Sequence, residues 1–119
     1  MASSYSTDKI RNVVLLGHGG CGKTSLSEAM LFNSGAINRL GRVEDGNTVS
    51  DYDDEEIGRT MSLSLSVLPC QWKEHKINVF DAPGYTDFQG EMLNGIHVAD
   101  TVVIVLDSSS GVEVGTQLA

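Results

Sequence analysis

Cysteine is scarce in this sequence, and so are long apolar runs. The two cysteines, Cys21 and Cys70, form neither a disulfide framework nor a cluster of metal ligands. No apolar run approaches the roughly 20 residues that a membrane-spanning helix needs. The polar start, Met-Ala-Ser-Ser-Tyr-Ser-Thr, lacks the charged and then apolar order of a secretory signal. We therefore expect a cytoplasmic protein that has no membrane partner.

Basic residues are also few. Eight lysines and arginines stand against 16 acidic residues, which gives a formal net charge of −8. Nucleic-acid binders usually carry a basic face, so we expect no broad nucleic-acid surface here, although one local basic site is compatible with this charge. Apolar residues make up 40% of the chain, as in ordinary globular proteins. A length of 119 residues fits one compact domain or part of a larger one.

The first half of the chain predicts a strand, a glycine-rich turn and a helix. Residues 12–16 (Asn-Val-Val-Leu-Leu) are a short apolar run of the kind that forms a strand buried on both faces. Residues 23–33 then follow a helical pattern, in which Leu26 and Met30 recur on one side and Ala29 and Leu31 on the neighbouring flank. Gly35 is expected to terminate this helix. Strand, turn and helix are thus the local context of the glycine-rich segment.

Residues 36–58 show no periodicity and carry seven acidic side chains, which fits either a solvated loop or a functional one. Apolar residues then alternate with serines over residues 61–67, which predicts a half-buried strand near a sheet edge, with Pro69 at its end. A polar turn at residues 73–76 and an apolar return over residues 77–80 predict an antiparallel hairpin.

The second half of the chain predicts alternating helices and strands. Phe88, Met92 and Ile96, with Leu93 beside them, trace one face of a second helix. Residues 101–106 form another β-branched apolar run, and a third helix is expected to begin near Val112. This alternation predicts an α/β domain with a mostly parallel sheet and one antiparallel edge hairpin. Because the last helix has no room to finish, we expect residues 1–119 to be the front part of a domain.

The segment from Gly17 to Thr24 (Gly-His-Gly-Gly-Cys-Gly-Lys-Thr) has the spacing of a phosphate-binding loop. Glycines let successive backbone amides converge on phosphate oxygens, and the helix that follows directs its positive end to the same point. Lys23 is expected to reach the β and γ phosphates, and the Thr24 hydroxyl to ligate Mg²⁺. The predicted nucleotide-binding residues of this element are Gly17, His18, Gly19, Gly20, Cys21, Gly22, Lys23, Thr24 and Ser25.

Asp81-Ala82-Pro83-Gly84 follows an apolar strand at the spacing of a second phosphate-site element. An aspartate at the carboxyl end of a strand can hold the magnesium shell, so Asp81 is a predicted metal residue together with Thr24. Gly84 is expected to donate its amide to the γ phosphate and to move when that phosphate leaves. With Tyr85, the segment 81–85 completes the predicted nucleotide-binding residues.

Several motifs together resemble the start of translation elongation factor G. They are the phosphate loop, the acidic run with Arg59, the alternating strand, Trp72-Lys73, Ile77-Asn78, and the segment from Asp81 to Phe88. The resemblance implies a three-layer GTP-binding domain of the phosphate-loop type, which takes GTP or GDP with Mg²⁺ and acts on the ribosome. It also implies catalytic roles for Lys23, Gly84 and the residue at position 85. The guanine-reading Asn-Lys-x-Asp motif of that family does not occur in these 119 residues.

Two departures from the family pattern concern hydrolysis. Ala82 and Tyr85 stand where the family has the threonine and histidine of Asp-Thr-Pro-Gly-His. The family histidine orients the attacking water, and a tyrosine hydroxyl has a different reach and no imidazole chemistry. The family's switch threonine aligns with Ser62, which keeps a hydroxyl for the metal, and Thr60 is the alternative in a shifted register. These changes resemble the divergent elongation-factor-G-like paralogues.

The sequence leaves three hypotheses for function. The chain is a GTPase switch of a ribosome-bound factor, or a GTP/GDP-binding module with weak or no hydrolysis, or a different phosphate-loop ATPase or kinase. Ribosome-stimulated hydrolysis separates the first two hypotheses, and competition between GTP and ATP separates both of them from the third.

Overall fold

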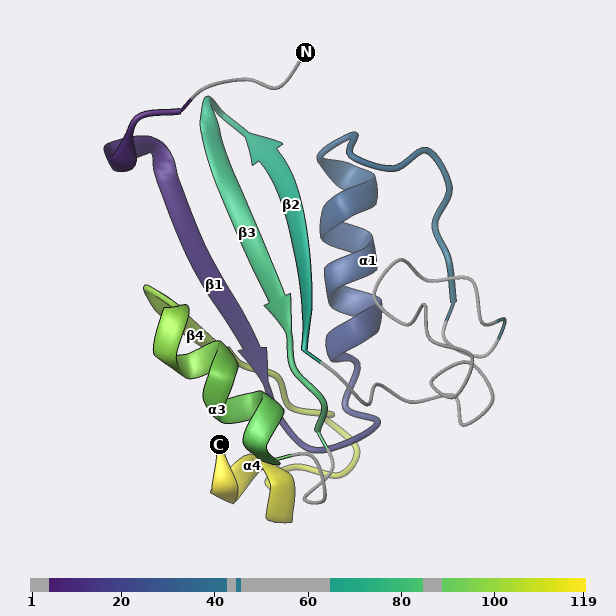
Figure 1. Cartoon of the computed structure of the whole chain (residues 1–119). Coiled ribbons are helices and arrows are strands. Elements are labelled where there is room, and N and C mark those ends of the chain that lie inside the picture. Colours follow the sequence, from purple (N-terminus) through teal and green to yellow (C-terminus); the bar gives the residue numbers. More distant parts are fainter. Residues whose placement is uncertain (1–4, 43–44, 46–64, 85–88) are drawn as a thin grey trace.

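The computed structural model describes residues 5–42, 45, 65–84 and 89–119, and it contains one sheet with helices on both faces (Figure 1). The elements follow one another in the order η1 (Thr7–Lys9), β1 (Ile10–Leu16), α1 (Lys23–Asn33), β2 (Ser66–Trp72), β3 (His75–Asp81), α3 (Gln89–Val98), β4 (Thr101–Ile104) and α4 (Val114–Leu118).

The sheet has the strand order β2-β3-β1-β4. Strand β1 pairs in parallel with β3 and with β4, whereas β2 pairs with β3 in antiparallel orientation. The predicted α/β fold with a mostly parallel sheet and one antiparallel edge hairpin is therefore confirmed. In parallel strands the carboxyl ends meet at one edge, so the ends of β1, β3 and β4 lie together at the foot of the sheet in Figure 1.

Alternate residues of the central strands pack on opposite faces, which creates two cores. On the α3 side the buried cluster is Val14, Leu16, Phe80, Ala82 and Met92. On the α1 side it is Leu15, Leu31, Leu68, Cys70 and Val79. The period of two along β1 sends Val14 and Leu16 to one face and Leu15 to the other. The predicted strand buried on both faces is thus confirmed for the end of β1 that leads into the glycine-rich turn.

The predicted antiparallel hairpin is present, but its first strand extends further along the chain than predicted. The described strand β2 runs from Ser66 to Trp72, whereas residues 61–64 of the predicted strand lie outside the described residues. The prediction that Pro69 ends the strand is wrong, because Pro69 sits at its centre, opposite Asn78. The position tolerates proline because β2 is the edge strand of the sheet that the described residues form. The turn itself is Lys73 and Glu74, both with positive φ.

Helix α1 begins and ends where the sequence predicts, yet one residue of the predicted apolar pattern is exposed. Leu26 is 38% exposed, whereas Ser27 and Glu28 are fully buried together with Leu31. The prediction is therefore wrong for Leu26, whereas Leu31 and Met30 of the predicted pattern pack in the core on the α1 side. The buried face also holds polar groups, and one of them, the Glu28 carboxylate, accepts the Gly41 amide. At the carboxyl end the Gly35 amide donates to the Phe32 carbonyl (3.1 Å), and the next amide donates to the Leu31 carbonyl (2.9 Å). These two bonds form the glycine terminus that the sequence predicts.

The second half of the chain follows the predicted alternation with shorter elements. Met92 is buried on α3 and Ile96 packs beside it, as predicted, whereas Leu93 is exposed. Strand β4 ends at Ile104 rather than at residue 106, and all four of its residues are exposed. Two reciprocal bonds fix the approach to β4, since the Asn12 amide donates to Asp100 (2.9 Å) and the Asp100 amide donates to the Asn12 carbonyl (2.8 Å).

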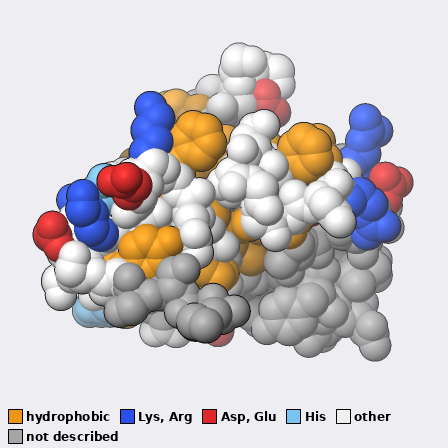
Figure 2. Space-filling view, turned by 90° about the horizontal axis from the view of Figure 1, so that it is seen from above, with side chains coloured by type: hydrophobic (Ala, Val, Ile, Leu, Met, Phe, Trp, Pro, Cys, Tyr) orange, Lys and Arg blue, Asp and Glu red, His pale blue; other side chains and the backbone are white. Residues whose placement is uncertain are grey.

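Figure 2 views the end of the molecule opposite the carboxyl ends of the parallel strands. Hydrophobic side chains surface there between charged side chains of both signs, and the charged groups gather toward the rim. Within the described part of the chain, no helix is long and apolar enough to span a bilayer.

Candidate functional site

The glycine-rich segment forms a loop between the carboxyl end of β1 and the amino end of α1. Residues 17–22 make the turn, and Lys23, Thr24 and Ser25 form the first turn of α1. Gly20 and Gly22 have φ angles of +80° and +104°, in the left-handed region that side chains other than glycine rarely adopt. The glycine at position 22 is also the residue before the helix, so the loop and the amino end of α1 are one continuous turn.

Lys23 folds back over this loop. Its side chain is only 6% exposed. The ammonium donates to the carbonyl oxygens of His18 (3.0 Å) and Gly17 (3.3 Å), and it lies 3.6 Å from the Sγ of Cys21. The backbone carbonyls thus hold the end of the lysine side chain against the loop. The loop therefore presents the lysine charge and the helix amino end at one place, as an anion-binding site requires.

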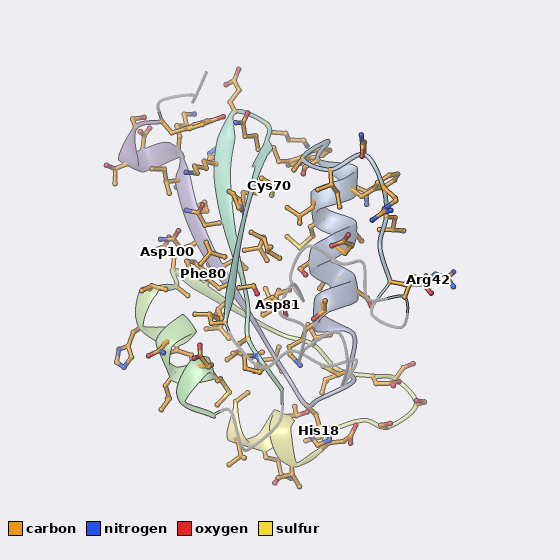
Figure 3. The ribbon with its side chains drawn as sticks, turned by 45° about the vertical axis from the view of Figure 1, so that its right-hand side comes forward. His18, Arg42, Cys70, Phe80, Asp81 and Asp100 are labelled. Atoms are coloured by element: carbon orange, nitrogen blue, oxygen red, sulfur yellow. The ribbon has the colours of Figure 1, made fainter. Side chains whose placement is uncertain are left out.

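The strand that carries Asp81 lies directly beside this loop. Asp81 is the last residue of β3 and is fully buried. The Thr24 hydroxyl donates to its Oδ2 over 2.7 Å, so two segments that are 57 residues apart in sequence meet through hard oxygen atoms. Figure 3 shows Asp81 between the sheet and α1. A hydroxyl and a carboxylate of this kind are suitable ligands for Mg²⁺, which takes one or two protein oxygens and completes its shell with phosphates and water.

Gly84 lies against the same loop from the other side. A Cβ atom built on it would come within 2.4 Å of the Lys23 Nζ and 2.6 Å of the Gly19 amide nitrogen. Contacts this short leave no room for any side chain at position 84. Between Asp81 and Gly84, Ala82 and Pro83 are buried, and Ala82 belongs to the core on the α3 side. The segment after β3 is therefore packed by Ala82 and held close to the loop by Gly84.

His18 links the loop to the start of α4, which the sequence does not predict. Its Nδ1 accepts a hydrogen bond from the Gly115 amide (2.9 Å), and its Nε2 lies 3.1 Å from the Oε2 of Glu113. In Figure 3 the His18 side chain lies at the foot of the sheet beside α4. No signal in the sequence connects positions 18 and 115, because the contact depends on how the chain returns after β4.

Away from the loop, the pKa values of Cys70 and Asp107 depart from their ordinary ranges. Burial raises the pKa of the Cys70 thiol, and a hydrogen bond with Ser34 opposes that effect. Hydrogen bonds from the Ser109 hydroxyl and amide lower the pKa of Asp107, the first residue of the turn that ends at Gly111. Cys70 is therefore a protonated core residue at neutral pH, and Asp107 is an ionised residue that fixes a turn.

The structure brings together most of the predicted site. The loop residues 17–22, the helix residues Lys23 and Thr24, and the segment 81–84 converge within hydrogen-bonding or van der Waals distance. Ser25 is exposed on α1. Tyr85 and Ser62, the predicted hydrolysis and metal residues, lie outside the described residues, as does Thr60. Ser27 and Glu28 lie buried on the helix face next to Thr24, which the sequence does not predict.

Comparison with known proteins also indicates a nucleotide-binding site. The family model described as "Elongation factor Tu GTP binding domain" matches residues 8–119. The chain is 38% identical over 117 residues to a ribosome-releasing factor 2, mitochondrial, from Kluyveromyces lactis, and this match covers 98% of the chain and 15% of that protein. It is 36% identical over 111 residues to an elongation factor G from Granulibacter bethesdensis, with 93% of the chain and 16% of that protein covered.

A solved structure agrees with the sequence comparisons. A crystal structure of a protein from Thermus thermophilus superimposes with a TM-score of 0.89 at 41% sequence identity, and the match covers 92% of this chain and 16% of that chain. The chain thus spans about a sixth of the length of the relatives named here.

Proposed function

Because this chain belongs to the elongation factor Tu GTP-binding domain family, we propose that it forms the nucleotide switch of a translation factor of the elongation-factor-G type. The family membership is shown by the match over residues 8–119, and the switching role on the ribosome is the proposal. The relatives named above are a ribosome-releasing factor and an elongation factor G. Both names describe proteins of translation, which supports the ribosome as the partner.

The observation that carries the proposal is the meeting of three segments at one point. Lys23 lies within the loop by bonds to two of its carbonyls, Thr24 is bonded to Asp81, and Gly84 touches the loop. A bound triphosphate would be held by the loop amides and by Lys23, and the Gly84 amide would donate to its γ phosphate. Loss of that phosphate would release the segment after Asp81, which is how such a switch changes state.

Magnesium is the metal that the donor set fits. Thr24 and Asp81 offer hard oxygens at the edge of the loop, and such oxygens with phosphate oxygens suit Mg²⁺. The ion would neutralise the charge that develops on the phosphates. We propose that Ser62 supplies a further hydroxyl when the acidic segment closes over the nucleotide, with Thr60 as the alternative. The metal proposal rests on the chemistry of Thr24 and Asp81 alone.

Hydrolysis of GTP is the second part of the proposal. The family includes GTPases, so the site is expected to support attack of a water on the γ phosphate. Tyr85 stands where the family pattern has the histidine that orients this water. A tyrosine hydroxyl can hydrogen-bond a water but cannot provide imidazole chemistry. The replacement of histidine by Tyr85 is the one observation that speaks for the alternative function, which is nucleotide binding with weak or no hydrolysis.

We further propose that residues 1–119 are the N-terminal portion of one GTP-binding domain. The proposal is supported by the small share of each relative that the chain covers. Localisation in the cytoplasm stays a prediction, and the yeast relative is named as a mitochondrial protein.

The experiment that tests the proposal is a titration of the full-length protein with fluorescent GTP and GDP. Replacing Lys23 by alanine removes a buried ammonium from the centre of the loop, and we expect the affinity for GTP to fall by about 100-fold or more. Lys76→Ala is the matched control, because Lys76 lies at the other end of the sheet, opposite Ile10. Unchanged GTP binding by the Lys23→Ala protein would contradict the phosphate-loop assignment.

Two further measurements separate the alternatives. Competition of unlabelled GTP and ATP against the fluorescent ligand tests the guanine nucleotide, and preferential displacement by ATP would favour a different phosphate-loop enzyme. Single-turnover hydrolysis with and without ribosomes tests the switch. An absence of ribosome stimulation would favour the binding-module alternative.

A further inference from the structure

His18 occupies the second position of the phosphate loop, and its imidazole uses both nitrogens at once. Nδ1 lies 2.9 Å from the Gly115 amide nitrogen. Nε2 lies 3.1 Å from the Oε2 of Glu113. Both partners belong to the segment that begins α4, 95 and 97 residues further along the chain. The ring therefore ties the loop to an element that none of the predicted nucleotide-binding residues belongs to.

The two contacts fix the tautomer of the ring. The backbone amide of Gly115 can only donate, so Nδ1 must accept and carries no proton. In a neutral imidazole the proton then lies on Nε2, from where it donates to the carboxylate of Glu113. One tautomer satisfies both partners, and a ring turned over by 180° would satisfy neither. The orientation of His18 is thus determined from two sides.

The start of α4 is also closely packed against His18 and Gly84. A Cβ atom built on Gly115 would come within 2.7 Å of the His18 Cα and 2.9 Å of the Gly84 carbonyl oxygen. Gly115 is buried, and only a residue without a side chain fits there. The start of α4 therefore touches both the phosphate loop and the segment after Asp81, which are the two elements that contact phosphate in the proposed function.

His18 also contributes to the position of Lys23. The carbonyl oxygen of His18 accepts the shortest of the ammonium's bonds to the loop, at 3.0 Å. The side chain of His18 is held by α4 while its backbone holds the lysine. A rotation of this residue would disturb both contacts, because the carbonyl and the ring belong to one residue with few torsions between them.

We propose that His18, oriented by Glu113 and by the Gly115 amide, is a positioning residue that holds the phosphate loop in its ligand-ready shape. The proposal rests on the proposed function of the loop as a guanine-nucleotide site. A loop that is already ordered binds its ligand without the entropic cost of ordering at that moment. Breaking the link between His18 and α4 is therefore expected to speed nucleotide release, with little effect on the fold.

The test measures the dissociation rate of fluorescent GDP from the full-length protein. Glu113→Ala removes the acceptor of the Nε2 proton, and we expect release to become about three- to tenfold faster, the effect of one partly exposed hydrogen bond. Glu113→Gln keeps an acceptor oxygen at the same reach and should release GDP within about twofold of the wild-type rate. Gln117→Ala is the control on the same helix, because Gln117 is exposed.

Glu113 also forms a capping box with Thr116 at the amino end of α4: its side chain accepts the Thr116 amide, and its own amide donates to the Thr116 hydroxyl. A second variant is therefore needed to distinguish loss of the His18–Glu113 contact from a disturbed amino end of α4. His18→Ala leaves Glu113 in place, and it should speed release at least as much as Glu113→Ala. Because both changes break the same link, the double variant should release GDP no faster than His18→Ala alone.

Several outcomes would overturn the proposal. The proposal fails if both Glu113→Ala and His18→Ala release GDP at the wild-type rate. It also fails if Glu113→Ala releases GDP faster and Glu113→Gln does not return the rate to that of the wild type. An effect confined to Glu113→Ala, with a lowered unfolding midpoint, would refute the link and assign the residue to the helix end only. If the wild-type protein binds no guanine nucleotide, the proposed function fails as well, whereas normal binding with unchanged variants refutes only the role of His18.

Discussion

Replacing Gly84 by alanine tests how closely the segment after β3 must approach the phosphate loop. The new methyl carbon would lie 2.4 Å from the Lys23 Nζ, 2.6 Å from the Gly19 amide nitrogen and 2.7 Å from the His18 carbonyl carbon. The lysine end can swing away, but the other two atoms belong to the backbone of the loop. Relief of the clash therefore requires the two segments to separate.

The size of the separation follows from these distances. Real Cβ atoms essentially never approach another heavy atom within 3.0 Å, so the contact of 2.6 Å must lengthen by at least ~0.4 Å. Forcing an extra methyl into a packed site costs about 1–3 kcal/mol. If that cost falls on the nucleotide-bound state, it lowers affinity by about 5- to 150-fold. GTP should lose more than GDP, because only GTP has the γ phosphate that the Gly84 amide is proposed to contact.

The assay is a parallel titration of full-length wild-type and Gly84→Ala protein with fluorescent GTP and GDP. Gly90→Ala is the matched control, since a Cβ atom at Gly90 meets nothing within 4 Å and alanine is favoured in a helix such as α3. Unchanged GTP affinity in Gly84→Ala would refute the close-approach argument. An equal loss for GTP and GDP would leave the steric argument standing and contradict the γ-phosphate contact.

Three other predictions use the same protein. Cys21 should react with a maleimide faster than Cys70, because Cys70 is buried and burial raises the pKa of its thiol. Mass spectrometry measures the two reaction rates, and excess GDP should slow the reaction of Cys21 only. Equal rates for the two cysteines would contradict the packing. Glu28 is 1% exposed and accepts a hydrogen bond from the Gly41 amide (3.1 Å). In denaturant titrations Glu28→Ala should therefore lower the free energy of unfolding by about 2–4 kcal/mol, and Glu28→Gln should lower it less. Equal losses in the two variants would exclude a stabilising role for the side-chain oxygen that accepts this bond. Tyr85→His should raise ribosome-stimulated single-turnover hydrolysis if the missing imidazole limits it, and no change or a loss would show that Tyr85 serves its own mechanism.

Burial of α1 and the position of Pro69 show where sequence patterns fall short. Apolar spacing predicted Leu26 on the buried side of α1, but the structure buries Glu28, whose carboxylate accepts the Gly41 amide. A buried charge with a partner is indistinguishable in sequence from a solvated one. Among the described strands β2 lies at the edge of the sheet, where a proline in mid-strand is tolerated. Strand order is a property of the whole sheet and cannot be read from the residues around Pro69.

By itself the sequence determined the local parts of the site. The glycine spacing from Gly17 to Lys23 fixes a loop at the end of a strand, and the period of two along β1 fixes which residues reach each core. These signals are local because backbone torsions and side-chain alternation are set by neighbouring residues. The sequence also predicted that Thr24 and Asp81 share one metal site, but their direct hydrogen bond appears only in the folded chain. The contacts of His18 with Glu113 and Gly115 had no signal in the sequence. Those contacts arise because the carboxyl ends of parallel strands share one edge of the sheet, which brings together residues that lie far apart along the chain.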